Sequence, residues 1–400
     1  MNVIGIVGEY NPFHLGHAYH INKTKELLGE DCPVVCAMSG DFVQRGEAAV
    51  FSKYARAEAA CKSGADLVLE LPLPWVLSSA EGFARGAVGL LGAVGVVTHL
   101  SFGSESGELS QLETLAEALL DPFIGADIRR VLAENEGISF AAARQKALYG
   151  RVGETAELLS VPNNILAVEY IKTVYDNGFD MKPVTVRRMG AGHDMIVESG
   201  LRSASDLRTR LARGGDIDAF VPASASEVYR REERLGRGPV MAESIEQAVL
   251  SRLRMLSAAG FAALPDAGEG LDNRLMKACR EESGIDAVLA AAKSKRYAMS
   301  RLRRMLMCAV LGVTDGMASG IPPYASVLAA NARVCALLKD MNARSRIPVL
   351  TKPASVKELE PECVSLFELG AAAHDLYVLG YAAREERKGG ADWKSSPKIL

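Results

Sequence analysis

The first 120 residues alternate short apolar runs with amphipathic stretches, and this alternation restricts the fold more than any other feature of the chain. The apolar runs are rich in Val, Ile and Leu and short enough for β-strands, whereas the stretches between them have helical spacing. Repeated β–α–β units produce a parallel sheet, so we predict a doubly wound α/β fold that binds ligands at the carboxyl ends of its strands. The predicted strands span 3–7, 33–38, 66–71 and 96–102, and the predicted helices span 16–28, 52–63, 78–92 and 108–120.

The pattern changes near residue 190. Helices at 127–149 and 163–175 and a late strand at 183–188 complete the first part of the chain. A Ser/Arg-rich stretch then follows, and the remainder is mainly helical with Gly/Pro-containing turns. We expect an α/β domain of residues 1–190 and a mainly α-helical domain of residues 191–400. Its predicted helices span 244–258, 272–282, 284–293, 297–311, 324–340 and 365–384.

The two parts differ in charge, although the whole chain carries a formal net charge of only −3. Residues 1–180 contain 13 Lys and Arg against 23 Asp and Glu, whereas residues 181–400 contain 33 against 26. This asymmetry indicates an acidic part that acts on a small molecule and a basic part that faces a polyanion. The alternative is a chance placement of solvated charges.

Neither a membrane segment nor a signal peptide is indicated. No run reaches the ~18 uninterrupted apolar residues that a membrane helix needs, and residues 1–7 enter an apolar strand without a preceding basic segment. We therefore expect a cytoplasmic protein without a membrane partner. The seven cysteines are scattered and form no CxxC or CxxH cluster, so we expect reduced thiols and no bound metal. The oligomeric state is left open.

The first predicted strand runs directly into GEYNPFHLGHAYH at residues 8–20. This segment matches neither GxGxxG nor GxxxxGK[ST], so no dinucleotide site of the usual kind and no P-loop is indicated. His14 and His17 can share one face at a helix start, beside free N–H groups and the positive end of the helix dipole. Gly16 leaves room for a phosphate to approach the backbone. Such a pair can stabilise charge on an α-phosphate under in-line attack, whereas the alternative is two ordinary polar residues.

A strand followed by NPFHxGH and a helix resembles the nucleotidyltransferase superfamily that includes the class I aminoacyl-tRNA synthetases. Longer segments make the resemblance more specific and extend it over nearly the whole chain. The chain is similar to the bacterial tRNA(Met) cytidine acetate ligase family at 39–72, 92–106, 161–172, 186–194, 203–208 and 293–306. This resemblance implies that acetate is activated with ATP as acetyl-adenylate, with release of pyrophosphate. The acetyl group then passes to N4 of the wobble cytidine of elongator tRNA(Met).

The resemblance also implies an ATP site, with His14 and His17 as its catalytic residues. Outside the first loop this site falls on Gly103, on Asn163 or Asn164, and on Arg188, with Arg187 as the alternative. An Asn after a proline can also simply cap a helix, and the arginine can form a surface ion pair. Mg²⁺ is expected with ATP, although no dedicated metal site is visible. The implied residues of the first loop are Val7, Gly8, Glu9, Tyr10, Asn11, Pro12, Phe13, His14, Leu15, Gly16, His17, Ala18, Tyr19 and His20.

Three polar residues, Asp41, Gln44 and Arg45, follow the second predicted strand on the ligand side of the sheet. Acetate needs a cation or N–H donors and little room, so Arg45 and the loop amides are candidates for holding it. The alternative is a capped surface loop. Lys53 and Arg56, one helical turn apart, are expected on a solvated face, with pyrophosphate binding as the alternative.

The second half contains clusters of cations. The densest has no acid among its members and surrounds Tyr297; it comprises Lys293, Lys295, Arg296, Arg301, Arg303 and Arg304. Contacts to the backbone of a folded RNA need such a positive surface, and an exposed aromatic residue can stack on a base. We therefore expect tRNA to bind here, the alternative being a solvated helix face. Two further groups are Arg202, Arg208, Arg210 and Arg213, and Arg230, Arg231, Arg234 and Arg237.

These observations predict an ATP-dependent tRNA-modifying ligase whose partners are ATP, acetate and elongator tRNA(Met). One alternative is a small-molecule adenylyltransferase of the same superfamily, which would not depend on tRNA. Another is a non-catalytic RNA-binding protein, which the intact His14, Gly16 and His17 disfavour.

Overall fold

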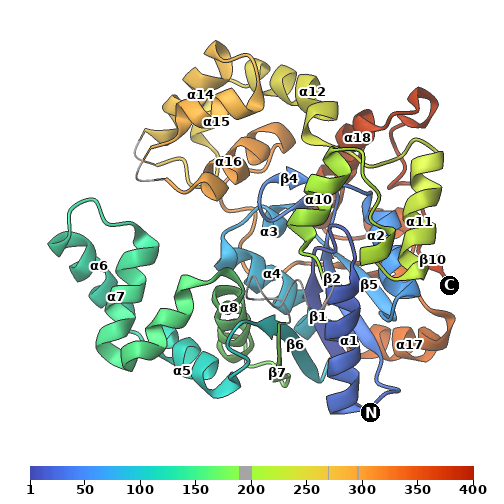
Figure 1. Ribbon diagram of the computed structural model, residues 1–400, viewed down its shortest axis with the longest axis horizontal. Coiled ribbons are helices and arrows are strands. Elements are labelled where there is room, and N and C mark those ends of the chain that lie inside the picture. Colours follow the sequence, from blue (N-terminus) through green and yellow to red (C-terminus); the bar gives the residue numbers. More distant parts are fainter. Residues whose placement is uncertain (189–200, 269, 295–296) are drawn as a thin grey trace.

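The computed structural model describes residues 1–188, 201–268, 270–294 and 297–400 (Figure 1). Its described residues contain an eight-stranded sheet in the order β10-β8-β5-β2-β1-β6-β7, with β9 beside β8. Neighbouring strands from β5 to β7 are parallel. These five strands confirm the predicted doubly wound sheet; they are β1 (Ile4–Gly8), β2 (Val34–Ser39), β5 (Leu67–Leu71), β6 (His99–Ser104) and β7 (Lys182–Arg187).

Helices cover both faces of the sheet, as the alternation of side chains along β2 requires. Val35 and Ala37 belong to the core beneath α4 (Ala80–Ala93) and α8 (Pro162–Asp176). The intervening β2 side chains belong to the core beneath α1 (Leu15–Leu28) and α2 (Lys53–Lys62). Each strand is therefore buried on both sides.

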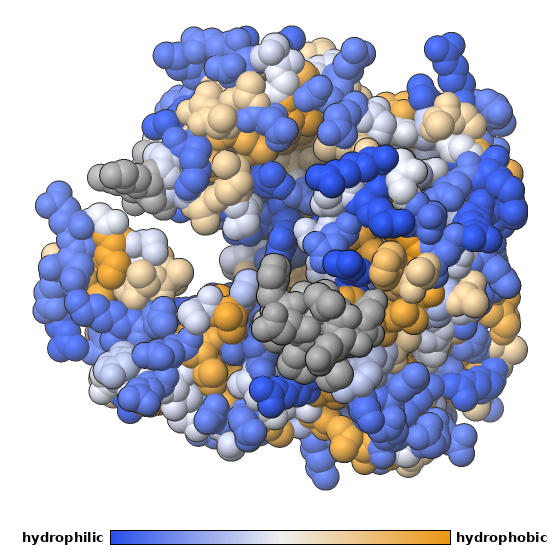
Figure 2. Space-filling view, in the orientation of Figure 1, coloured by the Kyte–Doolittle hydropathy of each residue, from blue (hydrophilic) through white to orange (hydrophobic). Residues whose placement is uncertain are grey.

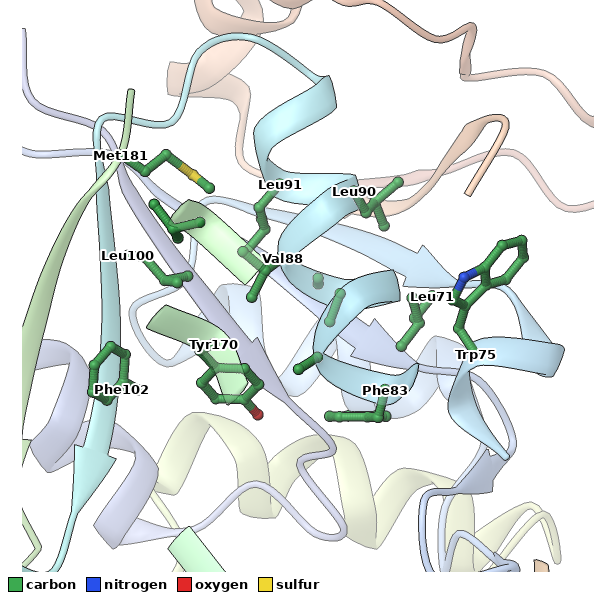
Figure 3. Packing of buried hydrophobic residues seen from close by; sticks show 14 of the residues in the cluster. Leu71, Trp75, Phe83, Val88, Leu90, Leu91, Leu100, Phe102, Tyr170 and Met181 are labelled. Carbon is green, nitrogen blue, oxygen red and sulfur yellow. The ribbon is translucent and has the colours of Figure 1, made fainter. Parts of the chain in front are cut away.

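The core beneath α4 is shown in Figure 3. Val88 and Leu91 of α4 point toward the sheet, where Leu100 and Phe102 of β6 lie. Tyr170 of α8 packs in the same cluster, and its ring centroid lies 6.0 Å from that of Phe102. This packing fixes the level at which β6 ends, and with it the position of the loop that follows.

Two groups of helices project away from the sheet. One is an arm formed by α5 (Leu109–Leu120), α6 (Ile124–Glu134) and α7 (Phe140–Val152). The other is a bundle with a core of its own, formed by α3 (Leu73–Val76), α12 (Ala242–Met255), α13 (Ala258–Ala262), α14 (Leu271–Glu281), α15 (Ile285–Ala292) and α16 (Met299–Leu311). Figure 2 shows the surface hollowed between the arm and the bundle.

The helix predicted at 324–340 is wrong in its first half. Residues Ala325–Ala330 form β8, which pairs antiparallel with β5, and α17 (Cys335–Arg344) begins only afterwards. The reason is that β8 lies between two strands and is largely buried, so its continuous apolar run has no period that distinguishes a strand from a buried helix. At this side of the sheet the edge is formed by β9 (Val349–Leu350) and β10 (Lys398–Ile399), and β7 forms the opposite edge.

The second half of the chain also contributes helices to the first. Cores shared with α1 and α2 include residues of α10 (Ala204–Ala212) and α11 (Ala223–Arg234), and α18 (Pro361–Tyr377) packs against α3. The division at residue 190 therefore stays a prediction, because the sheet and its covering helices draw on both halves of the chain.

Other sequence expectations concern single groups. Six cysteines whose side chains are described are buried and free. Among the described residues no three His, Cys, Asp or Glu side chains gather as a metal site would require. In the same residues, no helix has the length and apolar character needed to cross a membrane.

Candidate active site

The HxGH segment lies where β1 ends and α1 begins. His14 is the N-cap residue of α1, and its Nδ1 accepts a hydrogen bond from Gly16 N at 3.0 Å. In return, Nδ1 of His17 accepts from His14 N at 3.2 Å. The two rings stack with centroids 3.8 Å apart. Each imidazole thus satisfies an N–H group that the first helical turn would otherwise leave without a partner.

This reciprocal capping determines the tautomer of both histidines. A ring nitrogen that accepts a hydrogen bond from a backbone N–H cannot itself carry a proton. Since both Nδ1 atoms accept, the proton of each neutral ring resides on Nε2. His14 and His17 therefore present two Nε2–H donors at the positive end of α1, the chemistry that an anionic ligand requires.

Gly16 has a different local role from the one predicted. A Cβ atom at this position would lie 2.8 Å from Cε1 and 3.0 Å from Nδ1 of His14. The glycine thus makes room for the imidazole that caps the helix. Approach of a phosphate to the backbone, the role expected from the sequence, stays a prediction.

The three histidines of the segment are held neutral. Burial, assisted by the positive charges of Arg188 and Arg208, lowers the pKa of His14 to about 4. Burial and the adjacent His14 hold the pKa of His17 well below 6.5. Burial also lowers the pKa of His20 to about 4. A histidine with this pKa is a neutral donor at physiological pH.

His20 faces the neighbouring strand. Its Nε2 lies 2.9 Å from Oγ of Ser101 on β6, which in turn is 2.7 Å from Oγ1 of Thr24. His20 thereby joins α1 to β6.

Arg56 holds the loops that follow β1 and β2. Its side chain is fully buried, and its guanidinium donates to the carbonyl oxygens of Phe51, Glu9 and Ser39 at 2.9, 2.5 and 3.1 Å. It also donates to the carbonyl of Gly40. The expectation of a solvated Arg56 is wrong, because the loop carbonyls at the strand ends need buried donors once the loops fold over them.

Residues from the second half of the chain hold the HxGH loop from outside. Phe13 N donates to the hydroxyl of Tyr229 on α11 at 2.8 Å. Arg208 on α10 donates to the carbonyl of Asn11 at 3.0 Å, and Asn11 Oδ1 accepts from Val50 N at 2.9 Å. The loop is therefore fixed on three sides before any ligand binds.

The two asparagines at the start of α8 have different partners. Asn164 is buried, and its Oδ1 accepts from the backbone N of Glu105 at 3.0 Å, so it shapes the loop after β6. Asn163 is partly exposed and accepts from the guanidinium of Arg188 at 3.2 Å. Asn163 also donates to the Glu105 carboxylate at 2.5 Å. Of the two, Asn163 is the one placed beside Arg188.

The lack of a side chain at Gly103 leaves room for the side chain of Arg188 at the end of β6. A Cβ atom on Gly103 would stand 3.1 Å from Cγ of Arg188. Arg187, the alternative at the sequence level, ends β7, and its Cβ lies 2.9 Å from a Cβ built on Gly107. The residues implied by the resemblance at 103, 163 and 188 thus form one group.

The residues expected to hold acetate lie around a small hairpin, β3 (Phe42–Val43) and β4 (Glu47–Ala48). The backbone N of Gln44 donates to the Glu9 carboxylate at 2.7 Å, which joins the hairpin to the HxGH loop. The side chain of Gln44 is partly exposed, and Arg45 is exposed. The hairpin therefore presents Arg45 to solvent beside the loop that carries the histidines.

Asp41 is committed to other partners. Its Oδ1 accepts from Lys53 N at 2.7 Å, and its Oδ2 lies 2.7 Å from Nδ1 of His374 on α18. Burial by itself raises the pKa of the Asp41 carboxyl, but His374 and the cations Lys53 and Arg56 outweigh it and lower that pKa to about 2. Burial would lower the pKa of His374, yet the Asp41 carboxylate raises it. Asp41 anchors the hairpin to the C-terminal part of the chain.

Lys53 is buried as well, which corrects the expectation of a solvated side chain. Its Nζ lies 2.8 Å from the Glu70 carboxylate and 2.5 Å from that of Asp392. Tyr54 donates to the same Asp392 carboxylate at 2.7 Å. An amine removed from water needs such partners, and here β5 and the C-terminal segment supply them.

The predicted tRNA-binding cluster is only partly described, since Lys295 and Arg296 lie outside the described residues. Arg303 pairs with Glu47 of the hairpin. Burial lowers the pKa of Arg304. Arg303 thus joins α16 to the hairpin, and a role of these cations toward RNA stays a prediction.

The aromatic residue of this cluster is buried rather than exposed. Tyr297 is 6% exposed, and the guanidinium of Arg301 lies 5.2 Å from its ring centroid. Arg301 also donates to the Asp266 carbonyl at 3.0 Å, and Lys293 donates to the Ser294 carbonyl at 2.9 Å. The expectation that Tyr297 stacks on a base from an exposed position is therefore wrong, because the ring fills the core of the bundle.

Sequence reasoning did not predict the contacts that support the site from a distance, and it expected one of the residues that make them, Arg56, on a solvated face. His374, Tyr229 and Arg56 lie in stretches whose local pattern says only that they are helical. Arg208 lies in the SASDLR segment, so the resemblance pointed to its region without showing its contact with Asn11.

A mostly parallel sheet with two capping histidines at the first strand–helix junction defines the class: a nucleotidyltransferase of the HxGH type. A family profile described as HIGH Nucleotidyl Transferase matches residues 1–392. The tRNA(Met) cytidine acetate ligase of Thermoanaerobacter sp. (strain X514) is 35% identical over 390 residues, which cover 95% of this chain and 96% of that protein. The corresponding protein of Acetivibrio thermocellus is 34% identical over 418 residues and is covered completely, as is this chain.

A solved structure is also similar to this chain over its whole length. The crystal structure of Thermotoga maritima TmcAL bound with alpha-thio ATP is 31% identical, covers both chains completely and has a TM-score of 0.92. The chain belongs to the tRNA(Met) cytidine acetate ligase family and is an enzyme of the ligase class. The family resemblance and the fold class predicted from the sequence are confirmed.

Proposed function

We propose that this enzyme activates acetate with ATP and transfers the acetyl group to N4 of the wobble cytidine of elongator tRNA(Met). The observation that carries the proposal is the pair of Nε2–H donors that reciprocal capping creates at the start of α1. Its support is the membership of a family whose relatives bear that activity in their names, one of them solved with an ATP analogue.

In the first step an acetate oxygen attacks the α-phosphorus of ATP. The new P–O bond forms as the bond to the bridging oxygen breaks, and pyrophosphate leaves with that electron pair. Charge on the non-bridging oxygens increases in the transition state, where His14 and His17 donate from Nε2 and the positive end of the α1 dipole adds to the stabilisation. Because the donors are already oriented, little reorganisation is needed.

Other residues around the loop are proposed to bind the nucleotide and the acetate. Asn163 and Arg188, which contact each other, lie next to Gly103 at the end of β6 and are proposed to hold the nucleotide. Arg45 and the amides of the hairpin are proposed to hold the acetate carboxylate. Asp41 is left out of this direct role, because both its oxygens are engaged.

Mg²⁺ is expected as the counterion of the ATP phosphates. The described residues form no cluster of carboxylates or histidines that fits a metal ion, so no step of the proposal is assigned to one. The ion would arrive with the nucleotide.

In the second step N4 of the cytidine attacks the acetyl carbonyl, loses a proton, and AMP leaves. The test supplies tRNA(Met) transcript with labelled acetate and ATP, or with labelled acetyl-CoA alone. Label is expected in tRNA only in the first reaction, with AMP and pyrophosphate released in equal amounts. Labelling from acetyl-CoA without ATP contradicts the adenylate route, and adenylate formation without any tRNA acetylation favours a small-molecule adenylyltransferase.

A further inference from the structure

Helix α10 borders a pocket of about 470 Å³ on the side away from its contact with the HxGH loop. Its lining includes Arg202, Asp206, Arg210, Arg213 and Phe220. Its volume lies in the range of sites that accept small molecules, about 300–1,000 Å³. None of the roles described above for the active site uses these residues.

The pocket is strongly positive. Three guanidiniums face a single carboxylate, and that carboxylate is already used, since Asp206 accepts from the hydroxyl of Ser203 at 2.8 Å as part of the α10 cap. Arg210 has a second carboxylate at the limit of ion-pair distance, since its Nη2 lies 4.0 Å from Asp216, whereas no ion pair within the described part of the chain engages Arg202 or Arg213. Figure 2 shows strongly hydrophilic side chains gathered over α10. The charges of Arg202 and Arg213 are thus available to a ligand.

An aromatic ring holds two of the guanidiniums in place. Arg202 and Arg210 lie 5.9 and 5.6 Å from the ring centroid of Phe220. Arg210 also donates from Nε to the carbonyl of Asp216. A guanidinium that rests on a ring loses less side-chain entropy when it binds, and its outer N–H groups stay free for a planar or tetrahedral anion. Arginines next to an aromatic ring are the donors that phosphate and a stacked base both require.

The pocket is also close to the site of the reaction. Arg208, on the opposite side of α10, donates to the carbonyl of Asn11 in the HxGH loop. The separation of pocket and loop is therefore about one helix diameter, ~10–12 Å. A splayed single strand of RNA covers this distance within a few nucleotides.

We propose that the pocket formed by Arg202, Arg210, Arg213 and Phe220 binds a phosphate-bearing nucleotide of the RNA substrate, next to the cytidine that reacts. This inference rests on the proposed function. It assigns to α10 two roles, one toward the HxGH loop and one toward the RNA strand.

The test is the double variant R202Q/R213Q, which removes two exposed charges without disturbing the core. The matched control is K339Q/R344Q, which removes two exposed charges from α17, away from α10 (Figure 1). Affinity for tRNA(Met) is measured between 50 and 200 mM salt, and ATP affinity is measured separately. R202Q/R213Q is expected to weaken tRNA binding several-fold and to reduce the log–log salt slope by roughly 1.4–1.8, while ATP affinity stays unchanged. The control is expected to match wild type.

Three results overturn the assignment: an unchanged tRNA affinity and slope in R202Q/R213Q, an equal loss in the control variant, or a parallel loss of ATP affinity. The last result means that a free nucleotide occupies the pocket. If wild type itself neither binds nor acetylates tRNA, the proposed function fails, and this outcome is distinct from the other three.

Discussion

Substitution of Gly16 by alanine tests the capping arrangement without removing either histidine. The new methyl group would lie 2.8 Å from the His14 ring, closer than carbon atoms approach, so the imidazole has to leave its position over the helix start. Loss of the cap costs about 1 kcal/mol. Replacing a helical glycine by alanine contributes roughly 0.5–1 kcal/mol in the opposite direction. The two effects nearly cancel, so the free energy of unfolding is expected to change little.

The turnover of Gly16→Ala is expected to fall even though its stability is nearly unchanged. If the displaced ring no longer donates from Nε2 to the α-phosphate, one transition-state donor is lost, which lowers kcat by about 10²-fold or more. We expect near-wild-type stability in denaturant unfolding together with this loss in an ATP–acetate adenylation assay, and little change in ATP affinity.

A matched control is Gly150→Ala. Gly150 is an exposed residue of α7, and a Cβ atom there meets nothing within 4 Å. This variant is expected to gain a few tenths to about 1 kcal/mol and to keep full activity. Near-normal turnover in Gly16→Ala would refute the reasoning, as would a loss of stability so large that it explains the loss of activity.

Three further predictions address single groups. Without ligand, His14 and His17 are expected to show the Nε2–H tautomer by ¹⁵N NMR. Because the pKa values of both histidines are lowered from 6.5 in the folded protein, they stay neutral at pH values at which the unfolded chain gains protons. The free energy of unfolding should therefore fall as the pH decreases from about 6.5 toward 4. Charge reversal at Arg45 is expected to raise the KM for acetate far more than that for ATP, and steady-state kinetics with an unaltered acetate KM would remove Arg45 from the acetate site. His374→Ala removes one hydrogen-bonded partner of the buried Asp41 carboxylate, which then depends on Lys53 and Arg56, and is expected to cost about 1–3 kcal/mol in urea unfolding, whereas an unchanged free energy of unfolding would show that the pair is unimportant.

The alternating first half of the chain could be predicted from the sequence because its signals are local. Each of the strands β1, β2, β5 and β6 is a short apolar run next to a helix of regular period, and their ends were predicted within a few residues. The HxGH loop was found for the same reason, since both histidines and the glycine between them lie within one helical turn. Neighbours in sequence there are neighbours in space.

The tertiary structure alone decided which side chains hold this loop and which residues complete the sheet. Arg208 reaches Asn11 across 197 residues, Tyr229 reaches Phe13 across 216, and His374 meets Asp41 across 333. No local period encodes such contacts, because a buried arginine in a helix has the same sequence signature as a solvated one until its partners are folded around it. The insertion of β8 beside β5 is of the same kind, since an apolar run becomes a strand only when an open sheet edge is there to accept its hydrogen bonds.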